Sequence, residues 1–193
     1  MKDIKDCAEF YSSLLNKEFV FTLETDIKFK LVFSKKNFHH LLGLGKLTDI
    51  AELNLNNNYA DIIFGKILNG TISPEKISNS PNYFKIENRI KHFEQIVDML
   101  DSGKCKIIVD FNKDIVPDGT NLKFTKYILY IHKNDDYLLF TLGDKGKGIY
   151  PETFFYENSK RYLTNQIFLD VIDIEVIEKK KKNKVKNRTN KKK

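Results

Sequence analysis

The sequence predicts an α+β protein with one structured domain, residues 1–178, and two observations carry this prediction. Apolar residues recur at helical spacing near the N-terminus and again between residues 59 and 100, whereas they alternate with polar residues in other segments. The second half is rich in strand-like segments that do not alternate regularly with helices. This order, a helix, a hairpin, a helical insertion and an antiparallel meander, is not that of a doubly wound parallel sheet.

The N-terminal segment is predicted to form a helix followed by a hairpin. The apolar positions from Ile4 to Leu15 lie on one helical face. Residues 19–23 and 27–33 then alternate apolar and polar side chains, and the short Thr25-Asp26 link between them is typical of a hairpin turn.

The helical insertion is predicted from capping residues and apolar spacing. Ser34 is placed to cap a helix over residues 35–42, and Gly43 or Gly45 ends it. Further helical segments are expected in the rest of the insertion: a turn at 48–53, a helix from Tyr59 to Leu68, a short helix beginning at Ser73-Pro74-Glu75, and the longest helix at 82–100 with an apolar stripe of Ile86, Ile90, Phe93, Val97 and Leu100. Residues 54–58 are expected to form a loop.

The second half is predicted to contain four strands and one helix. The expected strands are 104–111, 126–132, 137–142 and 167–177. Residues 143–148 are glycine-rich and indicate a loop, while residues 150–156 are expected to form a loop that leads into a surface helix at 157–166.

The charge distribution separates a body from a tail. The chain of 193 residues carries a formal net charge of +7, but ten basic residues and no acidic residue follow position 178. Residues 1–178 therefore have a net charge of −3. We expect residues 179–193 to be a disordered Lys-rich tail, because this stretch has neither apolar periodicity nor an aromatic residue.

Several classes are excluded by composition. No apolar run approaches the roughly 20 residues that a membrane-spanning helix needs, and the charged N-terminal residues are unlike a secretory signal. The two cysteines, Cys7 and Cys105, provide neither a disulfide framework nor a metal pattern, and we expect both to be buried thiols. The sequence thus predicts a cytoplasmic protein without membrane attachment, metal or cofactor.

The segment from Asn37 to Lys46 contains the only adjacent histidines, His39 and His40. On a helix, His39 and Lys46 lie on the same face about two turns apart. An imidazole beside an ammonium suits RNA cleavage, because the base removes the 2′-hydroxyl proton and the cation stabilises the phosphate charge. The alternative is structural, with one histidine packed and the other solvated. Adjacent histidines cannot both face one point, so at most one would be catalytic.

The second candidate segment runs from Tyr150 to Gln166. Arg161 suits a phosphate grip, while Thr153 and Tyr162 can donate hydrogen bonds to a phosphate oxygen. The alternative is that these side chains pack on the sheet. Arg89 is expected only to pair with carboxylates such as Glu87 or Asp98.

Three segments together resemble a known family: residues 37–50 with the sequence NFHHLLGLGKLTDI, residues 86–90 with IENRI, and Thr153-Phe154-Phe155 with Tyr162 and Gln166. They are similar to the phage-associated nuclease-like domains grouped with barnase, EndoU, colicin-type tRNases and RelE. The resemblance implies a core of N-terminal helices on a four-stranded antiparallel sheet of the barnase/EndoU/RelE type. It also implies metal-independent RNA cleavage through a 2′,3′-cyclic phosphate.

The sequence and the resemblance together define the expected site. The candidate catalytic residues are one of the adjacent pair His39 and His40, together with Lys46, Thr153 and Tyr162. The expected substrate is RNA, with tRNA as one candidate. The residues expected to bind it are Arg161, Gln166, Lys179, Lys180, Lys181 and Lys182. The alternative function is a non-catalytic inhibitor from a mobile element that binds a host defence complex, and a further alternative is a nucleic-acid-binding accessory that acts through its tail.

Overall fold

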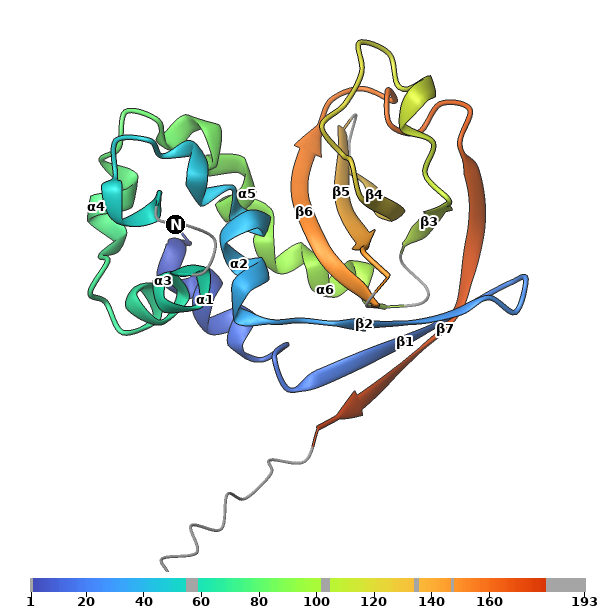
Figure 1. Cartoon of the computed structure of the whole chain (residues 1–193), viewed down its shortest axis with the longest axis horizontal. Helices are drawn as coiled ribbons and strands as arrows, with labels where there is room; N and C mark the ends of the chain where they lie inside the picture. The colour runs from blue at the N-terminus through green and yellow to red at the C-terminus, as the bar shows by residue number, and fades with distance from the viewer. Residues whose placement is uncertain (1, 55–58, 102–104, 134–135, 147, 180–193) are drawn as a thin grey trace, which may run out of the picture.

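A computed structural model describes residues 2–54, 59–101, 105–133, 136–146 and 148–179. Figure 1 shows a helical half and a β-barrel side by side, with α2 and α5 next to β6. The α-helices are α1 (Ile4–Ser12), α2 (Lys35–Leu42), α3 (Ala60–Leu68), α4 (Pro74–Ser78), α5 (Glu87–His92) and α6 (Ile96–Met99). Short 3-10 helices are η1 (Leu44–Lys46), η2 (Ala51–Leu53), η4 (Tyr83–Lys85), η5 (Phe93–Gln95) and η6 (Lys113–Ile115). The strands are β1 (Lys17–Leu23), β2 (Lys28–Val32), β3 (Lys106–Val109), β4 (Thr125–Lys133), β5 (Asp136–Asp144), β6 (Ile149–Glu157) and β7 (Ile167–Glu178).

The α+β class is confirmed, but the sheet is a closed barrel rather than an open four-stranded one. The strand order is β1-β2-β6-β5-β4-β3-β7. Strands β3 to β6 form the antiparallel meander. Closure comes from β7, which pairs with both β1 and β3, and from a parallel bridge between Leu31 of β2 and Ile149 of β6. These pairings join distant parts of the chain, so local patterns did not predict them.

The N-terminal elements agree with the prediction. The hairpin of β1 and β2 pairs in antiparallel register, and Asp26 in its turn has a positive φ of 60°. At the start of α2, the Ser34 amide donates a hydrogen bond to Asn37 Oδ1 at 3.0 Å. Helix α2 ends at Gly43, whose φ of +69° is the left-handed conformation that glycine adopts without strain.

The prediction of one long helix over residues 82–100 is wrong. The structure breaks this segment into η4, α5, η5 and α6. The buried side chains from residue 86 to residue 99 are Ile86, Ile90, Phe93, Ile96 and Met99, and Leu100 of the predicted stripe is also buried. Their spacing shortens from four residues to three, which matches the tighter 3-10 turn rather than the α-helix. Val97, expected on the apolar stripe, is 52% exposed.

The prediction for residues 150–166 is also wrong. Residues 149–157 form β6, and residues 158–165 form bends and turns instead of a helix. Strand β6 buries Pro151 and Phe154 three residues apart, so it lacks the alternation that identifies a strand. A β-bulge opposite Thr141 and Leu142 of β5 explains this shift in register.

Two apolar clusters hold the fold together. The first joins the helical half to the barrel interior and includes Tyr11, Phe38, Phe93 and Phe154, whose rings contact one another edge-on or tilted. The second covers the outside of β3 to β5 and consists of Ile108, Phe111, Val116, Ile128, Tyr137, Leu139 and Leu163. Residues 111–122 and 158–166 thus form a cover over the outer face of the barrel.

Both cysteines are buried, as predicted. Burial raises the pKa of each thiol to about 12, so both remain protonated at neutral pH. None of the helices in the described ranges is long and apolar enough to cross a membrane. The tail prediction falls almost entirely on residues 180–193, which lie outside the described residues.

Candidate functional site

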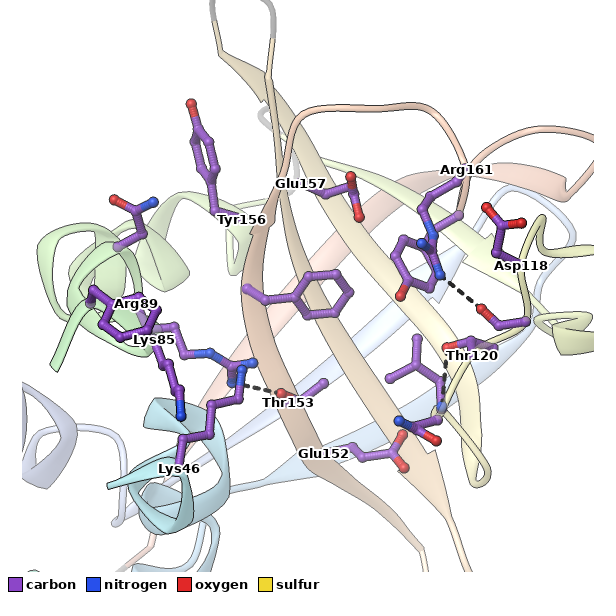
Figure 2. A pocket seen from close by; sticks show the side chains of 17 residues that line it. Lys46, Lys85, Arg89, Asp118, Thr120, Glu152, Thr153, Tyr156, Glu157 and Arg161 are labelled. Atoms are coloured by element: carbon purple, nitrogen blue, oxygen red, sulfur yellow. Dashed lines mark hydrogen bonds between the residues drawn. The ribbon is translucent and has the colours of Figure 1, made fainter. Parts of the chain in front are cut away.

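A cavity of about 780 Å³ lies between the helical half and the outer side of β6. Figure 2 shows the side chains that line it, with β6 running between helices on one side and the loop segments of the barrel cover on the other. We call it the polar cavity. Four of the residues predicted from sequence line it: Lys46, Thr153, Arg161 and Tyr162. The structure therefore brings together residues from two segments more than 100 positions apart.

One wall of the polar cavity is cationic and comes from the helical half. Lys46 ends η1, Lys85 ends η4 and Arg89 lies on α5. Figure 2 shows the three side chains gathered on the same side of β6. We call these three residues the cationic wall. Two of them, Lys85 and Arg89, were not predicted as site residues.

Arg89 holds three segments together. Its Nη1 donates hydrogen bonds to the carbonyl oxygens of Leu41 at 3.1 Å and His40 at 3.5 Å, and to Thr153 Oγ1 at 2.9 Å. The guanidinium thus occupies the C-terminal end of α2, where the helix dipole favours a cation. Burial lowers its pKa to about 10, so it remains charged at neutral pH. The hydrogen bonds of Nη1 go to these oxygens, whereas the sequence analysis expected carboxylates as partners.

Gly43 allows Arg89 to approach the end of α2. A Cβ atom on Gly43 would lie 3.3 Å from both Cζ and Nε of Arg89. The same glycine has the positive φ that ends the helix. Helix termination and placement of the guanidinium therefore depend on one residue of the HHLLGL segment.

Thr153 presents its hydroxyl beside the cationic wall. Its backbone amide donates to Oγ1 of the fully buried Thr141 at 3.1 Å, which fixes this point of β6. Because Oγ1 of Thr153 accepts a hydrogen bond from Arg89, the hydroxyl proton can be directed to an acceptor in the polar cavity. A phosphate oxygen is an acceptor of this kind.

The opposite side of the polar cavity is mixed in charge. Asp118, Glu152 and Glu157 contribute carboxylates, and Arg161 contributes a cation. Glu152 is the extra residue of the β6 bulge, and its carboxylate accepts a hydrogen bond from Thr125. We call these four residues the mixed wall.

Arg161 is partly engaged within the fold. Its Nη2 donates to the carbonyl oxygen of Gly119 at 2.8 Å, and its guanidinium lies 4.8 Å from the centre of the Tyr162 ring. Among the side chains described, Arg161 Nε is one of two buried polar groups without a hydrogen-bond partner. Tyr162 packs edge-on against Phe155, so its ring supports the cover of the barrel.

The polar cavity has four cationic and three anionic side chains in its described lining. Three of the four cations are on one wall, whereas residues 1–178 as a whole carry an excess of acidic groups. Partial burial, with the nearby charges of Arg89 and Lys85, lowers the pKa of Lys46. An anion bound at this wall would relieve the repulsion among these cations.

The two histidines line a second, smaller cavity of about 350 Å³, which we call the histidine cavity. Lys46 contributes to the lining of both cavities. His39 Nε2 lies 2.7 Å from the carbonyl oxygen of Leu53. Since a carbonyl can only accept, Nε2 carries the proton, and in the neutral ring Nδ1 is the basic nitrogen. Burial lowers the pKa of His40, and His39 and Lys145 lower it further.

The remaining candidates occupy other places. Gln166 is buried and bonded to the backbone of Asn112, accepting from its amide and donating to its carbonyl, both at 2.9 Å. Lys179 lies 3.3 Å from a Glu18 carboxylate oxygen, and its amide donates to the carbonyl of Asn16 at 2.7 Å. Lys180, Lys181 and Lys182 lie outside the described residues.

Arg89 is the principal residue that the sequence analysis did not assign to the site. It belongs to the IENRI segment, one of the three segments that carry the resemblance, and its contacts join the other two. The presence of IENRI together with the other two segments was the sequence signal that could have assigned Arg89 to the site. In the described ranges, no group of three or more His, Cys, Asp or Glu side chains is placed to hold a metal ion.

The fold and the polar cavity define an α+β protein whose barrel and helices enclose a cation-lined site suited to an anionic ligand. A family model described as phage-Barnase-EndoU-ColicinE5/D-RelE like nuclease 4 matches residues 3–193, and the chain belongs to this family. The family predicted from the resemblance is thereby confirmed. No curated protein and no solved structure matches the chain.

Proposed function

We propose that this protein is a metal-independent endoribonuclease that binds the scissile phosphate of RNA at the cationic wall. The observation that carries the proposal is the convergence of Lys46, Lys85 and Arg89 beside the Thr153 hydroxyl. Cations and an oriented donor stabilise the charge that develops on a phosphate during transfer. Membership of a nuclease-like family favours the same chemistry.

The proposed reaction is an internal transfer within RNA. The 2′-oxygen attacks the adjacent phosphorus, the bond from phosphorus to the 5′-oxygen breaks, and the products are a 2′,3′-cyclic phosphate and a 5′-hydroxyl. One group must accept the 2′-hydroxyl proton, and the leaving 5′-oxygen takes up a proton from water to give the 5′-hydroxyl. Lys46, Lys85 and Arg89 hold the phosphate, and Thr153 donates to one of its oxygens.

The histidine cavity supplies the proton acceptor in this proposal. The lowered pKa of His40 keeps its ring neutral at pH 7, and the tautomer of His39 leaves Nδ1 basic. Lys46, which borders both cavities, lies where the phosphate and the base would meet. Arg161, which the sequence analysis expected to hold phosphate, lies on the mixed wall, and Tyr162 packs beside it. In this proposal both residues position the RNA rather than hold the scissile phosphate.

The test is cleavage of total tRNA and of a synthetic RNA in EDTA, with the wild type beside Lys46→Ala and Lys36→Ala. Lys36 is exposed on α2 and is not part of the described lining of either cavity, so it is a matched control. We expect Lys46→Ala to lower the cleavage rate by about 10²–10³-fold, the usual effect of removing one stabilising donor. Lys36→Ala should cut at the wild-type rate.

Three results would contradict the proposal. The first is intact RNA with the wild type, and the second is equal cleavage by Lys46→Ala. The third is a product with a 3′-hydroxyl and a 5′-phosphate, because water rather than the 2′-oxygen would then be the nucleophile. Mass spectrometry of the fragments distinguishes the two kinds of product.

A second candidate function is inhibition of a host defence complex by direct binding. It is favoured by the acidic balance of residues 1–178 and by large apolar side chains exposed on β7, including Ile167, Ile172 and Val176. Exposed apolar surface of this kind is common where proteins associate. This function requires a stable complex with an identified defence protein and persists in Lys46→Ala, which separates it from the nuclease proposal.

A further inference from the structure

A further cavity, distinct from the polar and histidine cavities and about 500 Å³ in volume, lies on the outer side of the barrel at β3, β4 and β7. In Figure 1, β7, which contributes Phe168 to this cavity, lies on the opposite side of the barrel from the helical half, which contributes the cationic wall to the polar cavity. Its lining includes the aromatic side chains of Tyr130, His132, Tyr137 and Phe168. We call it the aromatic cavity.

The aromatic rings form two pairs. Tyr130 and Phe168 meet edge-on with centroids 5.9 Å apart, and His132 stacks on Tyr137 at 4.7 Å. Phe168 remains 41% exposed, although a phenylalanine at a strand position normally buries its ring. Exposed aromatic faces within a cavity provide surfaces on which a planar ring can stack.

Two lysines border the same cavity. Lys106 and Lys160 are exposed, and neither forms an ion pair within the described part of the chain. One carboxylate is nearby, because Asp170 is directly opposite Lys106 in the β3–β7 ladder. The balance around the rings is therefore cationic, and it suits a ligand with both an aromatic ring and negative charge.

The aromatic cavity is connected to the polar cavity through one turn of the chain. Lys160 lines the aromatic cavity, and the next residue, Arg161, lines the polar cavity. Leu163 and Thr164 of the same segment also face the aromatic cavity. A single-stranded nucleic acid that crosses this turn would contact Lys160 on one side of it and Arg161 on the other.

We propose that the aromatic cavity binds an unpaired nucleobase of single-stranded RNA, with the adjacent phosphates at Lys106 and Lys160. Aromatic side chains that stack bases and lysines that follow the backbone are the general means of binding single strands without sequence preference. The position of this subsite as a flank of the cleaved phosphate rests on the proposed function. Base binding itself does not depend on it.

The test uses a short fluorescein-labelled RNA in which every 2′-hydroxyl is replaced by 2′-O-methyl, so that transfer from the 2′-oxygen is blocked. Its dissociation constant is measured by anisotropy for the wild type and for Phe168→Ala, Phe168→Leu and Phe168→Tyr. We expect Phe168→Ala and Phe168→Leu to weaken binding about tenfold and Phe168→Tyr to retain it, because only a ring provides a stacking face. Phe124→Ala removes another exposed phenylalanine, outside this cavity, and should bind as the wild type does.

Two further measurements complete the test. Replacing both Lys106 and Lys160 by Gln should reduce the salt dependence of binding, with the slope of log affinity against log salt falling in magnitude by about 1.4 for two lost phosphate contacts on a single strand. Ultraviolet cross-linking of the same RNA to the wild type should label a peptide that contains Tyr130 or Phe168. This last measurement requires no variant to fold.

The proposal is overturned if Phe168→Leu binds as tightly as the wild type, if cross-links map only elsewhere, or if the wild type does not bind the RNA. Capture of a protein at this surface without RNA binding would also overturn it. Failure of the nuclease proposal gives a different pattern, in which RNA binds through Phe168 but natural RNA stays intact. If the Phe168 variants cleave natural RNA and bind the 2′-O-methyl RNA as the wild type does, only the aromatic subsite is refuted.

Discussion

The polar cavity and the histidine cavity share Lys46 but differ in origin and in chemistry. The polar cavity collects its charges from separate elements, with Lys85 and Arg89 on one wall and Arg161 on the other. The histidine cavity takes both of its titratable rings from consecutive positions of α2. In the proposed mechanism, this difference corresponds to a division of roles, in which the polar cavity holds the phosphate and the histidine cavity accepts the proton.

Removing both histidines is the strongest test of the different roles proposed for the two cavities. We expect His39→Ala/His40→Ala to lower kcat in EDTA by about 10²–10⁴-fold, the usual contribution of general acid–base catalysis. The KM should change little, since the phosphate contacts remain. Steady-state kinetics on a synthetic RNA measures both constants, and wild-type kcat in the double variant would show that the histidine cavity has no part in proton transfer.

The pH profile sharpens the same point. A base works when it is unprotonated, so activity should be present above the pKa of His40 and be lost as the pH falls through it. Because burial, His39 and Lys145 lower this pKa from 6.5, the acidic limb of kcat/KM should lie below pH 6.5. Lys145→Gln removes one of these causes and should move the limb to higher pH. An acidic limb above pH 6.5 that does not shift in Lys145→Gln would show that a group other than His40 controls the limb.

A smaller effect tests how α2 positions the cationic wall. We expect Gly43→Ala to lower the free energy of unfolding by about 1–2 kcal/mol, because the new side chain adds strain at a positive φ and crowds the Arg89 guanidinium. Gly70→Ala is the matched control: its φ is +81°, but no atom lies within 4 Å of the added Cβ.

Urea unfolding of both glycine variants measures the two contributions. Gly70→Ala should show the backbone strain alone, and the excess in Gly43→Ala should come from Arg89. Equal loss of stability in the two variants would mean that Arg89 moves aside freely, and that its placement does not depend on Gly43. Cleavage should then be unaffected in both.

Much of the N-terminal half could be predicted because local signals agree there. Ser34 and Gly43 bound α2, and the alternation in residues 19–33 matches the observed hairpin. Such signals depend on neighbours in the chain. The apolar residues of 86–100 were ambiguous by comparison. An α-helical stripe can be drawn through Val97, but the broken helical segment that forms buries Ile96 and Met99 and leaves Val97 exposed.

The barrel and the site required information that local patterns do not contain. Strand β6 is rich in residues that favour strands, such as Ile149, Tyr150 and Phe154, but its proline, its bulge and its buried residues three apart hide the alternation that would identify it. Arg89 looked like a surface arginine because its partners, Leu41 and Thr153, are 48 and 64 positions away. Only the tertiary fold brings the helix end and the strand to its guanidinium.

The most direct test of the central claim is a crystal structure with a short RNA that carries a 2′-deoxynucleotide at the scissile position, which removes the attacking hydroxyl. We predict that the phosphate following this nucleotide lies among Lys46, Lys85 and Arg89, within hydrogen-bond distance of Thr153 Oγ1, with its ribose toward the histidine cavity. A phosphate bound only at Arg161, or RNA bound away from the polar cavity, would contradict the assignment of the cationic wall as the phosphate-binding site.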